Sequence, residues 1–410
     1  MATTRLVILV VTYLLIAAPT LPFIRLTRPA AALVGAAAMV TVGRLPLRDA
    51  YAAIDLDVLV FLLGVLLISA CLELGGFFEW AAWHVVERAR SPRALLAAVV
   101  VTSGVLSALF VNDTICLVLT PLIIAVTRAL RLRPLPFLLA VALGANVGSA
   151  LTPIGNPQNM LIAVSSGVAF SRFVGAMLLP SLGGLAVVCI VISFVHRRDL
   201  VAPLAARDDV AEPPLDRGLV ARALVVFAGA LVGWLAGFSL PLVAIAAAAL
   251  LLAIARRDAA PVFARVEWPL LVFFGALFVV MRGARDLPIV ISLTATAAAS
   301  LHGAPLHDAV ITTAAMTALS NVVSNVPAVI LWLPVVPTVA APAFIWLVMA
   351  MSSTFAGNLT LLGSMANLIV AERAEGRGER VGFGDYLRVG LPVTVITLAW
   401  GVAALILVAR

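Results

Sequence analysis

The chain has 410 residues, of which 63% are hydrophobic and 11% are charged, and its formal net charge is +7 at pH 7. A soluble domain carries about 25% charged residues, so this composition excludes a soluble globular protein and indicates a polytopic, all-α membrane protein. The 27 basic residues are all arginine, which excludes lysine-dependent chemistry. The arginines lie between apolar runs, so they indicate membrane topology rather than nucleic-acid binding.

Twelve apolar runs are the predicted membrane segments, because one bilayer crossing needs about 20 residues. The N-terminal run has no clear small-x-small cleavage site and predicts a first membrane helix rather than a signal peptide. Residues 77–90 and 287–301 predict helices that lie along the interface. The runs are 6–24, 29–43, 55–76, 94–127, 134–171, 173–195, 220–236, 239–255, 267–281, 309–336, 338–371 and 389–409.

Arginines flank the run 94–127 on both sides. Arginine-rich flanks favour the cytoplasmic side, so we expect the run to enter the membrane and return as a re-entrant hairpin, with its tip near Val111–Thr114. A topology of about ten crossing helices and two hairpins, with both termini outside, places most arginines in the cytoplasm. The flanking residues are Arg88, Arg90, Arg93, Arg128, Arg131 and Arg133.

The uncharged run 134–171 is interrupted at its centre by SALTPIGNPQN (149–159). Proline removes a backbone donor and glycine weakens a helix. Unpaired backbone groups in hydrocarbon cost several kcal/mol each, so such a break survives only where protein or a wet cavity covers it. The stretch therefore predicts an interrupted helix whose half-helix ends, with their partial charges, form part of a binding site.

Both motifs recur in the second half of the chain. SALFVNDTICLVLTP (107–121) aligns with SNVVSNVPAVILWLP (320–334), and TPIGNPQNMLIA (152–163) aligns with TLLGSMANLIVA (360–371). The hairpin at 309–336 carries no arginine and falls on the outer side, so we expect the two halves to be inverted, which is typical of transporters.

The chain is therefore expected to consist of two inverted repeats joined by a linker. The first repeat is 1–195, with its hairpin at 94–127 and its broken helix at 134–171. The second is 220–410, with its hairpin at 309–336 and its broken helix at 338–371. The polar stretch 196–219 is the predicted cytoplasmic linker.

At these motifs the sequence resembles the ion transporter superfamily, which includes arsenite efflux permeases, sodium/proton antiporters, and citrate and dicarboxylate carriers. GNPQN (155–159) after GANVGSALT (144–152), together with FVND (110–113), most resembles the arsenite permease branch. The resemblance implies a secondary transporter in a bacterial-type cytoplasmic (inner) membrane, with periplasmic or extracellular termini, and a homodimer is plausible.

Dicarboxylate carriers place Ser-Asn-Thr at each hairpin tip, where a carboxylate and sodium meet. Here the tips read Val111-Asn112-Asp113-Thr114 and Ser324-Asn325-Val326-Pro327. Asn112 and Asn325 carry over by position. The middle of the first motif differs and the second lacks its threonine, which weighs against dicarboxylate binding.

Asp113 is the only charged residue between Ala94 and Thr127. An acid at bilayer depth costs about 2.5–3.5 kcal/mol on insertion scales, which makes Asp113 a functional candidate. Asp113 suits a proton carrier. One alternative is that it is an ionised ligand of sodium, with a sodium site near Ser107, Asn112 and Asp113. The other is that it is an acid that caps the returning half-helix. The other candidate substrate- or ion-binding residues are Asn112, Thr114, Asn146, Thr152, Gly155, Asn156, Asn159, Ser324, Asn325, Asn358, Thr360, Gly363 and Asn367.

The energy for transport is expected to come from an ion gradient, of H⁺ or Na⁺, because no GxxxxGK[ST] nucleotide motif occurs. The sequence leaves open whether an ATPase subunit associates with the chain. We expect no metal centre and no cofactor, since the cysteines form no CxxC pair and the histidines lack HExxH spacing. The hairpins and broken helices contain no arginine, so we expect no fixed cation to await an anionic substrate.

These features favour export of a small neutral inorganic solute, such as arsenous or antimonous acid, in exchange for protons. The alternatives are sodium- or proton-coupled carriage of an inorganic or di/tricarboxylate anion, sodium/proton antiport, and a passive channel. An enzyme is not expected. The stretch GFGD (382–385) matches the motif of intramembrane aspartyl proteases, but Asp385 lies in a segment rich in arginine and glutamate instead of at membrane depth.

Overall fold

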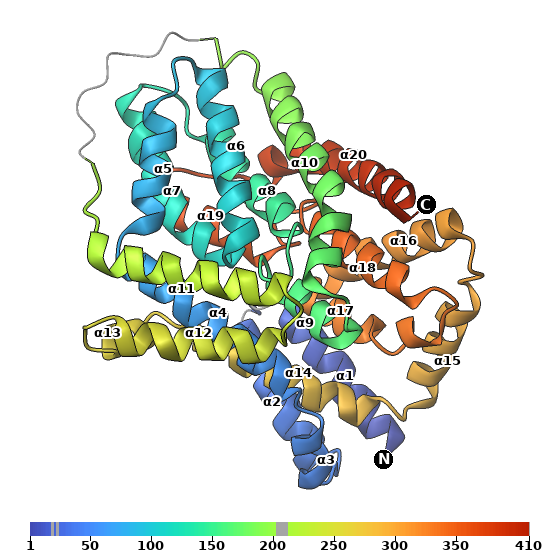
Figure 1. The fold of residues 1–410 in the computed structure, drawn as a ribbon. Coiled ribbons are helices and arrows are strands. Elements are labelled where there is room, and N and C mark those ends of the chain that lie inside the picture. Colours follow the sequence, from blue (N-terminus) through green and yellow to red (C-terminus); the bar gives the residue numbers. More distant parts are fainter. Residues whose placement is uncertain (18–19, 22–23, 202–211, 410) are drawn as a thin grey trace.

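The computed structural model describes residues 1–17, 20–21, 24–201 and 212–409, and these fold almost entirely into helices (Figure 1). Two-residue strands β1 (Thr20–Leu21) and β2 (Ile24–Arg25) pair between the first two helices. Part of the predicted linker, 202–211, lies outside the described residues. The chain is thus an all-α membrane protein. Six of the described helices are long and apolar enough to cross a bilayer, and shorter apolar helices accompany them.

Each half of the chain contributes ten helices to the described structure. In the first half these are α1 (Ala2–Ala17), α2 (Arg28–Thr41), α3 (Leu47–Ala52), α4 (Leu56–Leu74), α5 (Phe77–Glu87), α6 (Pro92–Leu109), α7 (Asn112–Ala129), α8 (Leu135–Ser149), α9 (Pro157–Ser166) and α10 (Phe170–Val195). In the second half they are α11 (Arg217–Leu235), α12 (Leu240–Ile254), α13 (Ala260–Phe263), α14 (Trp268–Ala284), α15 (Pro288–Ala299), α16 (Pro305–Val323), α17 (Asn325–Trp332), α18 (Pro342–Ala356), α19 (Met365–Glu375) and α20 (Phe383–Ala409), with a 3₁₀ turn at Val336–Thr338.

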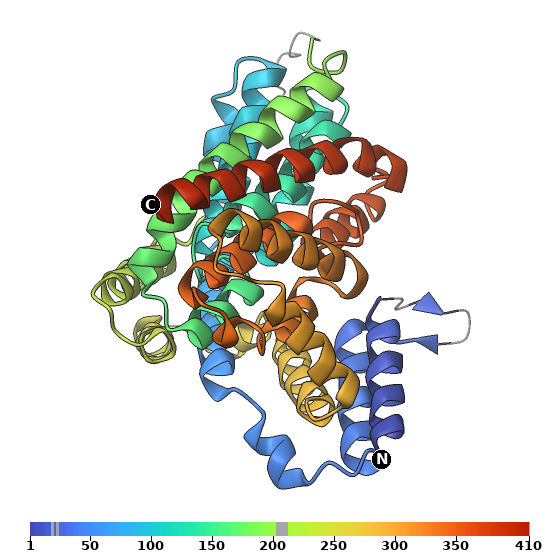
Figure 2. The ribbon, with the colours of Figure 1, turned by 90° about the vertical axis from the view of Figure 1, so that its right-hand side faces the viewer.

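The packing of the two halves follows one pattern. Helix α6 packs on α8, and α16 packs on α18; α4 packs on α12, and α2 packs on α14. The first two contacts each lie within one half of the chain, whereas the last two each join a helix of one half to a helix of the other. A two-fold relation between the repeats produces such reciprocal contacts. Figure 2 shows α20 crossing beside α10, its counterpart in the first half. The opposite orientation of the two halves in the bilayer stays a prediction.

Two groups of helices can be distinguished in Figure 1. We call α1, α2, α4, α11, α12 and α14 the scaffold group, in which α14 contacts both α2 and α4. We call α6–α10 and α16–α20 the hairpin group; it contains both hairpins and both broken helices.

The first hairpin turns where the sequence predicts it. Phe110 and Val111 have extended backbone between α6 and α7, and Asn112 begins the returning helix. The second hairpin turns at Ser324, whose φ of 77° lies in a region that residues with a Cβ seldom adopt. Its first helix begins at Pro305, four residues before the predicted start, because the Asp308 carboxylate accepts backbone hydrogen bonds from His302 and Gly303 and holds the helix start.

Both broken helices are interrupted near the predicted positions. Helix α8 ends at Ser149 and α9 begins at Pro157, where proline suits the first helical turn. Helix α18 ends at Ala356 and α19 begins at Met365. Helix α19 continues to Glu375, beyond the predicted end of the run at residue 371.

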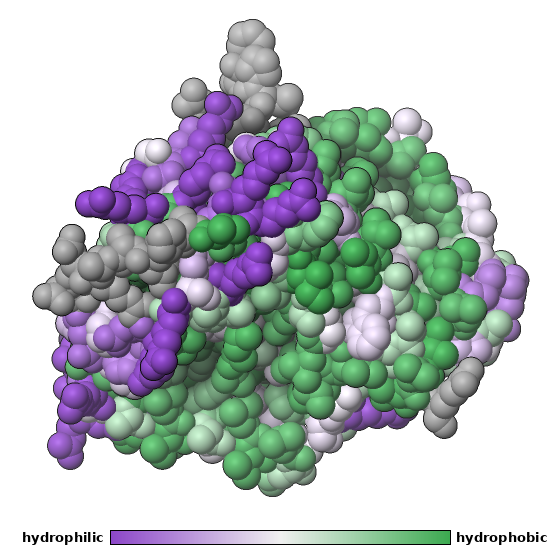
Figure 3. All heavy atoms as spheres, turned by 90° about the horizontal axis from the view of Figure 1, so that it is seen from above, coloured by the Kyte–Doolittle hydropathy of each residue, from purple (hydrophilic) through white to green (hydrophobic). Residues whose placement is uncertain are grey.

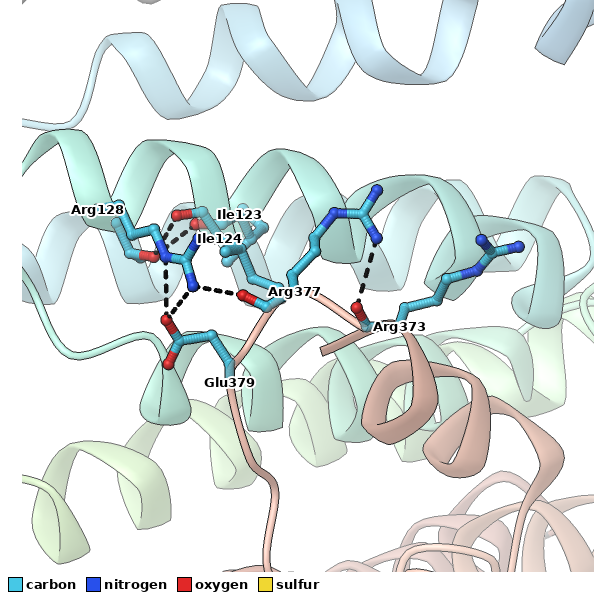
Figure 4. A network of polar contacts seen from close by, with 7 residues as sticks. Ile123, Ile124, Arg128, Arg373, Arg377 and Glu379 are labelled. Carbon is cyan, nitrogen blue, oxygen red and sulfur yellow. Dashed lines mark hydrogen bonds and ion pairs between the residues drawn. The ribbon is translucent and has the colours of Figure 1, made fainter. Parts of the chain in front are cut away.

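Polar contacts join the two halves at one end of the hairpin group. Figure 4 shows Arg128, at the end of α7, donating to Glu379 Oε1 (2.7 and 3.0 Å) and to the carbonyl of Arg377 (2.6 Å).

Hydrophilic side chains gather over one part of the surface in Figure 3, beside a broad apolar area. Arg133, His196, Arg198 and Arg388 line a pocket of about 480 Å³ between the ends of α8, α10 and α20.

Candidate functional site

The first hairpin tip is attached to the first helix break. The backbone N–H of Asn112 donates to the carbonyl of Gly155 (3.0 Å), and the Thr152 hydroxyl donates to the carbonyl of Ala108. A Cβ on Gly155 would lie 2.2 Å from the Ser149 oxygen and 2.7 Å from the Ser107 oxygen, so this approach requires glycine.

The second tip and break meet in the same way. With its nitrogen turned toward the carbonyls, the Asn325 side chain donates to Gly363 O (3.2 Å) and Ser353 O (3.1 Å). The Thr360 hydroxyl donates to Asn321 Oδ1 (3.1 Å). Each tip is therefore bonded to the break of its own repeat, and a tip and its break form one unit.

Asn159 and Asn367 hold the breaks open from the inside. The side-chain amide of Asn159 donates to the carbonyls of Ser149, Ala150 and Thr152 (3.3–3.4 Å). The amide of Asn367 donates to those of Gly357 (2.8 Å) and Thr360 (3.2 Å). The carbonyls of Ser149, Ala150 and Gly357 lie at the end of a half-helix, where backbone acceptors lack intrahelical partners. Both asparagines therefore act on the backbone.

Asn146 connects the two breaks. Its nitrogen donates to Asn358 Oδ1 (3.0 Å) and Asn367 Oδ1 (2.9 Å), and its oxygen accepts from Asn112 Nδ2 (3.1 Å) and Ser364 Oγ (3.0 Å). Asn156 caps α9 and donates to Ser149 Oγ (2.9 Å) and Thr354 Oγ1 (3.3 Å). These amides thus bond to other protein groups and rigidify the site.

A pocket of about 290 Å³ opens beside the two tips. Of the sequence-predicted site residues, Asn112, Asp113, Ser324 and Asn325 line it, and Asp113 is 7% exposed. The others lie behind this lining, in the tips and breaks: Thr114, Asn146, Thr152, Gly155, Asn156, Asn159, Asn358, Thr360, Gly363 and Asn367.

Two charged residues that sequence reasoning missed complete the pocket: Arg28 and Glu267. The buried Arg28 guanidinium donates from Nη1 to Ser324 Oγ (3.3 Å) and from Nη2 to the carbonyl of Leu362 (3.4 Å). Glu267 accepts a hydrogen bond from Thr114 Oγ1 (3.4 Å). The scaffold group therefore has a polar contact with each hairpin tip.

The expectation that no fixed cation lies at the site is therefore wrong. The hairpins and broken helices lack arginine, but α2 brings Arg28 to them. Arg28 precedes Pro29, and Glu267 precedes Trp268-Pro269, so each charge stands at a helix start before an apolar run. Charges in such positions normally mark the membrane interface. The local sequence signal at these two residues was the proline that follows them, which marks the start of a helix. It does not show whether that helix start faces the pocket or the membrane surface.

The electrostatics of the pocket depend on three side chains. Asp113 interacts with both Glu267 and Arg28, and Arg28 also interacts with Glu372. In the part of the chain that the structure describes, the ion pairs involve other residues, such as Arg265 with Glu73 (3.8 Å). With all three groups ionised, the pocket holds one positive and two negative charges.

Two oxygens near the first tip, Ser107 Oγ and Asn112 Oδ1, are buried without a hydrogen-bond partner. Hard cations take oxygen ligands, so these atoms are of the right kind for the predicted sodium site. The described residues contain no group of three or more His, Cys, Asp and Glu side chains that could hold a metal. Asp385 is 48% exposed and faces Arg388 (4.0 Å), unlike the buried pair that an aspartyl protease needs.

Comparisons with known proteins agree with a transporter. The sequence model of a family described as "Citrate transporter" (CitMHS) matches residues 12–356. The silicon efflux transporter LSI3 of Oryza sativa subsp. japonica is 31% identical, over 94% of this chain and 93% of that protein. A Dictyostelium discoideum relative that carries the transporter name arsB is 24% identical, over 93% and 88%.

A solved structure shares the fold. The crystal structure of the Alcanivorax borkumensis YdaH transporter, described as having an unusual topology, superposes with a TM-score of 0.59. The match covers 100% of this chain and 98% of that chain at 16% sequence identity, so the likeness concerns the fold alone.

Proposed function

The chain belongs to the citrate transporter family of the ion transporter superfamily, and from that premise we propose that this secondary transporter exports a small neutral metalloid hydroxide in exchange for protons. Arsenous, antimonous and silicic acid are solutes of this class. The relative named a silicon efflux transporter supports a solute of this class.

The charge of the pocket carries the proposal. A di- or tricarboxylate would meet Asp113 and Glu267 against the single guanidinium of Arg28. Unscreened like charges in a low-dielectric site repel by several kcal/mol. A neutral hydroxide avoids that repulsion, and its hydroxyls can donate to the side-chain oxygens of Asn325 and Asp113, which line the pocket.

The origin of the pocket residues supports alternating access. Asn112, Asp113, Ser324 and Asn325 belong to the hairpin group, whereas Arg28 and Glu267 belong to the scaffold group. Movement of the hairpin group past the scaffold group would carry a bound solute away from those two charges. In the predicted topology, with termini outside and the linker in the cytoplasm, the pocket faces the cytoplasm, the side from which an exporter loads.

Asp113 is the proposed proton carrier. It lies at the moving tip, in the first turn of α7, where a carboxylate is tolerated when ionised because the helix N-terminus carries a partial positive charge. The protein is proposed to work in a cytoplasmic-type membrane as a monomer or homodimer.

Proteoliposomes that contain the purified protein test the proposal. We expect an imposed pH gradient to drive arsenite across the membrane, and we expect the Asp113→Asn variant to lose this drive while keeping its elution profile. The Arg28 guanidinium is the feature that favours an anion carrier instead. Citrate or succinate uptake driven by sodium, without arsenite movement, would overturn the proposal.

A further inference from the structure

We infer that Arg28, Asp113 and Glu267 form a charge-balanced triad that carries one exchangeable proton, so that Glu267 and Arg28 are coupling residues of the scaffold group. This inference rests on the proposed proton-coupled transport. It adds two residues and a mechanism of coupling to a site in which the sequence indicated Asp113 alone.

The geometry brings the three side chains together from three helix starts. Arg28 begins α2, Asp113 lies in the first turn of α7, and Glu267 immediately precedes α14. All three line the same pocket of about 290 Å³. The Thr114 hydroxyl, next to Asp113, donates to Glu267 (3.4 Å), so the first hairpin tip is held beside the scaffold carboxylate.

The charge count favours one proton. One guanidinium and two carboxylates sum to −1 when all are ionised, and a single proton makes the set neutral. An uncompensated charge in a buried site is strongly destabilising, so we expect the pocket to take up a proton when it closes. A second proton would leave the Arg28 charge without a counter-ion.

The surrounding charged and titratable groups do not change this count. Glu73 of α4 faces Glu267 but pairs with Arg265 (3.8 Å). Glu372 of α19 faces Arg28 from an exposed position, where water and salt screen it. Cys116 of α7 is a thiol near Asp113, and Tyr386 of α20 is a phenol near Cys116. Groups of these two types are neutral at pH 7.

The distribution of the triad between the two groups couples the proton to movement. With its proton, Asp113 leaves as a neutral residue of the hairpin group, and the charges of Glu267 and Arg28 that stay behind sum to zero. Without its proton, the triad keeps one net negative charge, because Glu267 repels the Asp113 carboxylate more than Arg28 attracts it, and the empty hairpin group does not move. Protonation of Asp113 would thus permit the return step of the empty carrier, which its ionised form opposes.

Two transport modes measured in the same proteoliposomes test the triad. Arsenite counterflow needs no net proton movement, whereas uptake driven by a pH gradient does. In Glu267→Gln the charges of Arg28 and Asp113 balance without a proton, so gradient-driven uptake should fall to the level of empty liposomes, whereas counterflow should fall by a smaller factor. Glu267→Asp, which keeps a carboxylate, should retain gradient-driven uptake.

The double variant Arg28→Gln/Glu267→Gln makes the test specific. It leaves Asp113 without a counter-ion, so the site again needs a proton, and gradient-driven uptake should return. The exposed Glu87 at the end of α5 provides the matched control, and Glu87→Gln should behave as the wild type in both modes.

The outcomes separate the two proposals. Wild-type protein that moves no arsenite in either mode overturns the proposed function. Gradient-driven uptake that persists in Glu267→Gln overturns the triad alone. A double variant that exchanges arsenite by counterflow but stays uncoupled shows that the charge balance is wrong.

Discussion

Single asparagine side chains stabilise the breaks in the two interrupted membrane helices of this protein. Asn159 and Asn367 occupy equivalent positions in the two repeats, and each directs its side-chain nitrogen at carbonyls at the end of the preceding half-helix. The sequence predicted both residues as substrate- or ion-binding candidates. In the structure their side-chain nitrogens bond to backbone carbonyls instead, which keeps the pocket beside them rigid.

We expect Asn159→Ala to lower the stability of the protein. The substitution leaves buried carbonyls without donors, and each unsatisfied buried group costs about 1–3 kcal/mol. The measurement is the melting temperature of the detergent-solubilised protein. Asn112→Ala is the comparison, because Asn112 Oδ1 already lacks a partner. An equal or larger loss in Asn112→Ala would show that Asn159 does not hold the break.

A pH effect is expected at Asp199, in the loop after α10. Burial raises its pKa, but hydrogen bonds from His196 (3.0 Å) and Arg133 (3.2 Å) outweigh burial and hold the pKa below the ordinary value of 3.8. Because the folded pKa is depressed, these contacts stabilise the protein above the unfolded pKa and are lost as the pH falls through the folded pKa.

Asp199→Asn should therefore melt below the wild type at neutral pH, by an amount that corresponds to about 0–1 kcal/mol because Arg133 is exposed. The difference should shrink as the pH is lowered through about 4. Melting curves of both proteins over that range give the comparison, and a difference that grows toward acid would contradict this assignment.

At the scale of elements, close contact between helices positions the hairpins. Helix α8 lies against α6 where Gly148 meets Gly104: a Cβ on Gly148 would lie 2.2 Å from the Gly104 oxygen and 2.3 Å from its Cα. Small residues at such crossings let membrane helices approach closely. The first hairpin and the first broken helix are therefore packed backbone to backbone.

Gly148→Ala should push α6 and α8 apart and destabilise the protein by about 1–3 kcal/mol, the usual cost of overpacking. Gly175→Ala on α10 is the matched control, since a Cβ there meets nothing within 4 Å. The control should be neutral or slightly stabilising, because alanine is the better helix former. Melting temperatures decide the matter, and equal values for the two variants would show that the crossing tolerates a methyl group.

At the scale of the whole molecule, the two halves build two related pockets. The pocket of about 290 Å³ lies at the starts of α2 and α14. A second pocket, of about 320 Å³ and lined by Asp57 and Ser239, lies at the starts of the equivalent helices α4 and α12. In the predicted topology the first pocket faces the cytoplasm and the second faces outside, as the inverted-repeat prediction requires.

Cysteine accessibility tests this topology. In a variant without its native cysteines, Arg90→Cys and Arg133→Cys should both react with a membrane-impermeant maleimide from the cytoplasmic side, because in the predicted topology the hairpin between them does not cross the bilayer. Ser239→Cys, which is exposed in the structure, should react from the outside. Labelling of positions 90 and 133 from opposite sides would refute both the re-entrant hairpin and the repeat inversion.

The amino-acid sequence by itself determined the membrane class, the two hairpin tips, the two helix breaks and the family, because each leaves a local pattern. Apolar length predicts a membrane helix, and proline, glycine and asparagine within an apolar run predict a break. The recurrence of FVND- and GNPQN-like stretches indicates the repeat. The hairpin boundaries shifted by a few residues, where caps such as Asp308 act on neighbouring backbone.

Only the tertiary structure decided which side chains face the pocket. Arg28 and Glu267 stand far apart in the sequence, at helix starts that resemble ordinary interface positions. The packing of α2 on α14 brings both to one pocket, Arg28 against the second hairpin tip and Glu267 against the first. Packing within the hairpin group turned Asn146, Asn159 and Asn367 toward other protein groups. Side-chain direction at a helix end depends on non-local contacts between helices, and no pattern along one segment records those contacts.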